Sequence, residues 1–173
     1  MYPRAAMRFE PLLCLPTAWT SVCARFGVHL FEGTVTLADM DRLQSVGDRW
    51  NAQHPEKRVE LVVVLPSNAR MTHEERMRMV RLIKQGEAHR AATGTVILAE
   101  GLLASMQRSV LTGMMMLAPS PHPAKVFGNL ADAVAWLAPY VKDVCGDALK
   151  PEQLARMLDA HLAEFRARPD RPG

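Results

Sequence analysis

The sequence has few aromatic residues, few cysteines and no long uninterrupted hydrophobic segment. Aromatic residues make up 6% of the 173 positions, whereas there are eleven methionines, so we expect an aliphatic core with flexible thioether filler. Cys14, Cys23 and Cys145 form no CxxC pair, which argues against a zinc site or redox dithiol. Cys14 and Cys23 lie in apolar sequence and are expected to be buried.

Targeting and membrane signals are also missing. The longest apolar stretch, residues 110–119, is too short to cross a bilayer, and no signal-peptide core follows the first residues. These absences predict a cytoplasmic protein without membrane association. Net charge is only +3, with arginines gathered near the end of the chain, and no basic stripe is interleaved with aromatic residues. We therefore do not expect nucleic-acid binding.

No familiar catalytic motif is present. The sequence contains no GxSxG, no phosphate-binding glycine loop and no HExxH. Its six histidines are scattered without metal-ligand spacing. His73 is accessible at an expected helix start, but no nucleophile with an orienting partner accompanies it. We expect no catalytic residue, metal or cofactor.

The chain is organised around the apolar run at residues 59–65 and the turn that follows it. Four consecutive aliphatic residues predict a strand buried on both faces, since a strand with one buried face would alternate. Helices should then cover both faces of the sheet. Thr72 and Glu75 form a capping-box pair, which predicts a helix beginning at His73.

The remaining pattern predicts one α/β domain with a mixed sheet of four to six strands and helices packed on it. Residues 8–35 contain β-prone runs with at least one antiparallel pair, and strands near residues 61, 97 and 126 should be parallel. We expect five helices: one that begins after Thr36, one at 73–90 that Thr93-Gly94 ends, one at 102–117, one that follows Asn129, and one at 151–168. The expected later strands are 95–99 and 125–127, the latter near an edge of the sheet.

These elements divide the chain into four parts. Residues 1–7 form an N-terminal extension, 8–145 the α/β domain, 146–168 an additional C-terminal helix, and 169–173 a tail that we expect to be disordered.

One closing segment is distinctive. A short strand ending in Val126-Phe127 is followed by Asn129, an acidic residue and Ala-Val-Ala-Trp-Leu at 133–137. With the order of strands and helices, residues 8–141 resemble the STAS superfamily, which includes bacterial anti-sigma-factor antagonists. The resemblance implies a STAS-like, non-enzymatic regulatory module that acts by protein–protein interaction, with homodimerisation as an option.

In the regulatory STAS members, the loop after the central strand carries an Asp-Ser pair whose serine is phosphorylated. Here the corresponding residues read Asn68-Ala69-Arg70-Met71-Thr72, without that pair. Thr72 carries the hydroxyl group nearest to the position of that serine, and its role in the capping box is sufficient to explain why a threonine is present. The resemblance therefore predicts a module without the usual phosphoserine switch.

The same loop supplies the candidate binding residues. It lies at the carboxyl end of a parallel strand, where open α/β sheets bind ligands. One alternative is a small-ligand domain for an anion or nucleotide, or an unrecognised enzyme, using this loop; the other is a loop that is polar because it is solvated. The candidates for partner or ligand binding are Ser67, Asn68, Arg70, Thr72 and His73.

Two apolar surfaces could form an interface. Met115 and Met116 cannot share one helix face with Met114, so either several helices surround them or they are exposed for binding. The last helix has a wide apolar face that includes Leu158 and Phe165. This face either covers the sheet or docks a second subunit.

Overall fold

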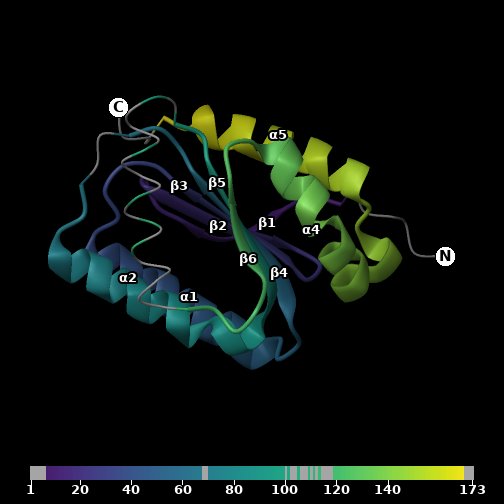
Figure 1. Ribbon diagram of the computed structural model, residues 1–173, viewed down its shortest axis with the longest axis horizontal. Helices are drawn as coiled ribbons and strands as arrows, with labels where there is room; N and C mark the ends of the chain where they lie inside the picture. The colour runs from purple at the N-terminus through teal and green to yellow at the C-terminus, as the bar shows by residue number, and fades with distance from the viewer. Residues whose placement is uncertain are drawn as a thin grey trace.

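The computed structural model describes residues 7–67, 70–99 and 119–169, together with positions 101, 105, 109, 111 and 113. In this part of the chain, a six-stranded sheet separates two helical layers, with α1 and α2 on one face and α4 and α5 on the other (Figure 1). The single mixed α/β domain is therefore confirmed. Asn68, Met115 and Met116, most of the expected helix at 102–117, and residues 1–6 and 170–173 lie outside the described residues.

The order of strands in the sheet is the same as their order in the chain. β1 to β3 pair antiparallel, whereas β3 to β6 pair parallel. This confirms both the predicted antiparallel start and the parallel strands near residues 61, 97 and 126, with the last strand at an edge. The strands are β1 Glu10–Cys14, β2 Ala18–Cys23, β3 Phe26–Phe31, β4 Arg58–Val64, β5 Arg90–Ile97 and β6 Ala124–Phe127.

The first two helices begin at the capping boxes that the sequence predicts. Thr36 pairs with Asp39, and Thr72 with Glu75, each side chain bonding the other's backbone N–H. Asn129 caps α4 by accepting from the backbone N–H of Asp132. The helices are α1 Leu37–Gln53, α2 His73–Gln85, α4 Leu130–Cys145 and α5 Pro151–Arg166, with short 3₁₀ turns at Glu87–His89 and Gly146–Ala148.

The predicted end of α2 was wrong. The helix ends at Gln85, and Thr93-Gly94 lies inside β5 instead of breaking a helix. The cause is tertiary: β5 pairs with β4 along its whole length, and this pairing outweighs local helix propensity. Gly94 also packs closely against α4, because a Cβ atom there would lie 3.1 Å from Cδ1 of Leu137.

One face of the sheet builds the main core. Alternate β4 residues Val59, Leu61 and Val63 are fully buried beneath α4 and α5. Leu158 and Phe165 of α5 join this core and are only 3% and 1% exposed. The last helix therefore covers the sheet of its own chain, and these two side chains are not available to a second subunit.

The cysteine prediction was only half right. Cys23 is buried in β2, but Cys14 is exposed at the end of β1. β1 is an edge strand with neither face enclosed, as its exposed and half-buried residues show. An apolar run therefore does not guarantee burial at the edge of a sheet.

Candidate functional site

A cavity of about 920 Å³ lies between the second face of the sheet and the helices α1 and α2. Its floor consists of the β-strand residues that alternate with the core residues, so Glu60, Val62 and Val64 of β4 point into it. The prediction of a strand covered on both faces therefore holds in a modified form: core covers one face and a lined cavity the other.

The middle of the cavity is apolar. Phe31, Val62, Val64 and Ile97 form the floor there. Facing helices contribute the opposite wall, and Leu111 packs against Val80 and against the small cluster of Ile97 and Ala99. The apolar wall residues from α1 and α2 are Leu43, Val46, Gly47, Trp50, Met79, Leu82 and Ile83, and the polar ones are Gln44, Asp48, Asn51, Arg76 and Gln85.

A buried charged cluster lies on the floor at the amino-terminal end of β4 and β5. Glu60 is 2% exposed and accepts a hydrogen bond from Nε of Arg58 at 2.7 Å, and another from Nε of Arg90. Nε2 of His29 lies 3.9 Å from Oε1 of Glu60, while its Nδ1 lies 3.1 Å from Oγ1 of Thr20. Three strands thus converge on one carboxylate.

The cluster keeps Glu60 ionised. Burial alone would raise its pKa, but the Arg90 guanidinium, the nearby His29 ring and the Arg58 guanidinium outweigh burial and hold the pKa of Glu60 well below the ordinary glutamate value. A permanent negative charge therefore lies beside two permanent positive charges.

Both arginines also tie the helices to the sheet. Arg58 donates from Nη1 to Oδ1 of Asn51 in the last turn of α1. Arg90 donates from Nη1 to the Ile83 carbonyl oxygen near the end of α2, at 2.6 Å. Gly86 leaves room for this arrangement, because a Cβ atom there would lie 2.6 Å from Nη2 of Arg90. The cluster fixes the carboxyl ends of both helices over the cavity.

A second polar group lies nearby on the loop before β6. Nε2 of His122 is 2.9 Å from Oγ1 of Thr93. Burial and the nearby Arg90 charge lower the pKa of His122, opposed in part by Glu60, so the imidazole is neutral at pH 7.

Ser120 lies beside the same ring but does not form a nucleophile–base pair. Its Oγ is 2.8 Å from Nδ1 and 3.1 Å from Nε2 of His122, and so lies between the two nitrogens instead of in line with either. No carboxylate is hydrogen-bonded to this imidazole among the described residues. The geometry suits polar contact with a ligand better than proton abstraction.

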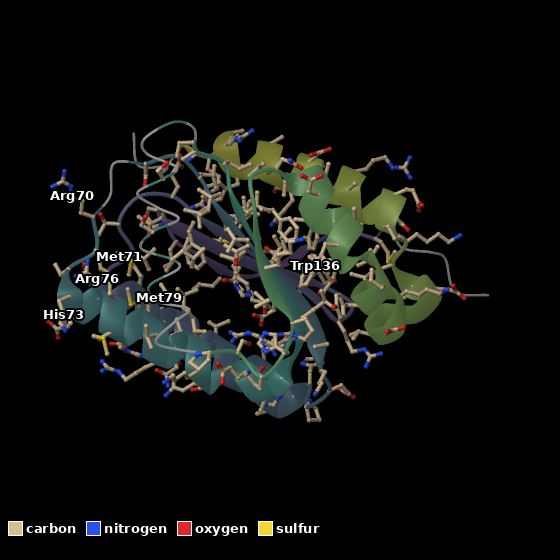
Figure 2. All side chains as sticks on the ribbon, in the orientation of Figure 1. Arg70, Met71, His73, Arg76, Met79 and Trp136 are labelled. Carbon is tan, nitrogen blue, oxygen red and sulfur yellow. The ribbon has the colours of Figure 1, made fainter. Side chains whose placement is uncertain are left out.

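The structure separates the predicted binding residues. Ser67 and Arg70 line the opposite end of the cavity, beyond the carboxyl end of β4. Thr72 is engaged in its capping box, and His73 is exposed. Figure 2 shows His73 at the outer end of α2, whereas Met79 lies between α2 and the sheet.

The residues of the charged cluster were missed at the sequence level. Glu60 was treated as the boundary of an apolar run, although it occupies an interior position of β4. The usable signal was an acidic residue in a strand with an arginine two positions earlier, and a second arginine at the start of the next strand. Such a pattern indicates a buried ion pair only once the strands are known to be neighbours.

Comparison with known protein families, curated proteins and solved structures gave no match. The STAS resemblance therefore remains a prediction. Within the described ranges, no helix is long and apolar enough to span a membrane. No group of three His, Cys, Asp or Glu residues in those ranges could hold a metal ion.

Proposed function

We propose that this protein binds a small, largely apolar molecule with one polar end in the cavity between the sheet and α1 and α2. The observation that carries the proposal is the apolar wall of a 920 Å³ cavity ending at a buried charged cluster. Ligand pockets typically enclose about 300–1,000 Å³, with mostly apolar walls and few oriented polar groups. The proposed role is binding without catalysis.

A neutral fluorescent probe tests this function. N-phenyl-naphthylamine becomes bright in apolar surroundings, and we expect saturable binding at one site per chain. Gly47 lines the cavity, and a Cβ atom there would have no neighbour within 4 Å. Gly47→Leu should therefore fill part of the cavity without disturbing the fold, and weaken binding by about tenfold or more, equivalent to about 1.4 kcal/mol.

Ser45→Leu is the matched control. Ser45 lies on the same helix but is exposed and does not line the cavity. The Ser45→Leu variant introduces the same leucine side chain outside the cavity and should leave probe binding unchanged. Absence of saturable binding to the wild type, or an equal loss in both variants, would contradict the proposal.

A second candidate is the STAS-like role: a cytoplasmic, bacterial regulatory module that binds a protein partner or a second copy. The observation that favours it is the exposed start of α2, where Arg70, Thr72 and His73 occupy the place at which the resemblance puts the regulatory switch. Self-association should appear in size-exclusion chromatography with light scattering. The double variant Arg70→Glu/His73→Glu should abolish it, whereas Arg49→Glu on α1 should not; a wild type that stays monomeric and captures no partner would count against this role.

A further inference from the structure

We propose that the charged end of the cavity selects an anionic head group, in particular a carboxylate, and this inference rests on the ligand-binding function proposed above. Two guanidinium groups meet one carboxylate there, and all three side chains are largely withdrawn from water. The exposed fractions are 11% for Arg58, 14% for Arg90 and 3% for Glu60. The cluster thus has an excess of one positive charge, because both arginines remain protonated at any pH at which the protein folds.

Other negative charges compensate this excess only in part. Arg90 donates to the Ile83 carbonyl, and so benefits from the partial negative charge at the end of α2. Arg58, in contrast, shares Glu60 and otherwise bonds the neutral amide oxygen of Asn51. Asp48 also lines the cavity, but it is exposed to solvent. Arg58 is therefore the less neutralised of the two guanidiniums.

The cluster also has unused hydrogen-bonding capacity. Nε and Nη1 of Arg58 are engaged, while Nη2 has no partner among the described residues. A guanidinium carries N–H donors on all three nitrogens, in a planar array that matches a carboxylate. An added anion can thus accept from Arg58 without displacing Glu60.

The floor beside the cluster leaves room for such a group. Gly27 of β3 lines the cavity and carries no side chain. A Cβ atom at this position would lie 3.7 Å from both Cγ of Glu60 and Nε2 of His29. A bare backbone therefore borders the charged end, and His29 and Thr93 are polar residues that also line the cavity there.

The apolar part of the ligand follows from the spacing along β4. Glu60 and Val64 point into the cavity four residues apart, which corresponds to roughly 13 Å at about 3.3 Å per residue. A decyl chain is of comparable length. Decanoate, decanol and decylammonium share this chain and differ only in the charge of the head group, so they isolate its contribution.

Isothermal titration calorimetry of the three compounds against the full chain tests the inference. We expect decanoate to bind about tenfold or more tightly than decanol, because a charge-assisted hydrogen bond replaces a neutral one. Decylammonium should bind most weakly, since it is repelled by both arginines. Arg58→Gln should bring the decanoate-to-decanol ratio close to one, and Glu60→Gln should raise it. Arg49→Gln, an exposed arginine on α1 outside the cavity, should leave it unchanged.

Using a ratio separates specificity from folding, because a partly unfolded variant loses apparent affinity for both compounds alike. Equal affinities for decanoate and decanol in the wild type, or a preference for decylammonium, would contradict the proposed selection of an anionic head group. Either result would leave the ligand-binding function unaffected. A decanoate preference that survives Arg58→Gln would also contradict the proposed selection. If none of the three compounds binds and N-phenyl-naphthylamine also fails, the ligand-binding function itself falls.

Discussion

Arg90 and Glu60, thirty positions apart in sequence, are hydrogen-bonded across the neighbouring strands β4 and β5, with Nε of Arg90 donating to Oε2 of Glu60. Arg58 pairs in register with Arg90, and each arginine follows the helix to which it is tied. Two successive helix–strand units therefore repeat the same arrangement around one shared carboxylate. The cluster anchors α1 and α2 and also gives one end of the cavity its charge.

Glu60→Gln should destabilise the protein strongly at neutral pH. It leaves two largely buried guanidiniums without a counter-charge, and breaking a buried ion pair costs about 3–5 kcal/mol. Urea unfolding at pH 7 measures the change. Glu56→Gln, in the exposed loop before β4, is the control and should have little effect.

The same variant should change the response to acid. Because the pKa of Glu60 is lowered in the folded state, the unfolded chain binds the proton first, and stability falls once pH drops below the ordinary glutamate pKa of about 4.3. Unfolding curves between pH 6 and 3 should be flatter for Glu60→Gln than for the wild type. Identical slopes would show that Glu60 is not the ionised group described here.

Two glycine-to-alanine substitutions should have opposite effects. At Gly86, the added Cβ displaces the Arg90 guanidinium from Glu60 and from the Ile83 carbonyl, which should cost about 1–3 kcal/mol. At Gly47, inside α1, the Cβ meets nothing, and the helix should gain about 0.5–1 kcal/mol. Thermal unfolding of both variants measures the two changes in stability. If both substitutions stabilise the protein, the Arg90 side chain can move away from Gly86 without a cost in stability, which would contradict this prediction.

His161 should make stability depend on pH between about 7 and 5. Its ring stacks on Trp19 with centroids 4.7 Å apart and contacts Phe9 at 5.0 Å, and its Nε2 has no hydrogen-bond partner in the described part of the chain. Burial lowers the pKa of His161, opposed in part by Glu164. As pH falls below the ordinary histidine pKa of about 6.5, the unfolded chain gains a proton that the folded chain does not, so stability is lost.

His161→Leu removes this titration. The free energy of unfolding of the variant should change less between pH 7 and 5, so its stability relative to wild type should rise as pH falls. Burial also lowers the pKa of His122, which titrates in the same direction, so some dependence should remain until His122→Gln is added.

Thr36→Ala and Thr72→Ala should each cost about 1 kcal/mol, because each threonine caps a helix through the backbone N–H three residues later. Chemical denaturation checks this, with Ser67→Ala as the control outside both caps. If Thr72→Ala leaves stability unchanged, the hydroxyl does not stabilise the helix start, and this result would favour a role of Thr72 as a modification site.

Local signals in the sequence were enough to predict most of the fold. Capping boxes marked the starts of α1 and α2, and the apolar face predicted for the last helix contains the buried Leu158 and Phe165 of α5. The boundary between α2 and β5 failed because residues 86–94 carry no strong strand signal. Their extended conformation depends on pairing with β4, which is a property of the assembled sheet.

The candidate site was harder to predict because its members come from separate elements. The general rule for strand ends selected Ser67 and Arg70, which line the cavity, and their role in binding stays a prediction. Glu60, Arg58 and Arg90 each look ordinary in isolation, and only the register of β4 and β5 brings them together. A cavity is likewise a property of how helices are placed above a sheet, which residue periodicity does not specify.

The agreement between strand order and chain order has a consequence for how the protein is made. Each strand pairs with the one before it, so no later segment has to insert between strands already joined, and the sheet can grow as the chain leaves the ribosome. The cover of the core face comes last, since α4 and α5 begin only at Leu130 and Pro151. Until they are synthesised, Leu61, Val63 and Val96 lack the helices that bury them, so a nascent chain halted before Leu130 exposes an apolar sheet face, which favours aggregation.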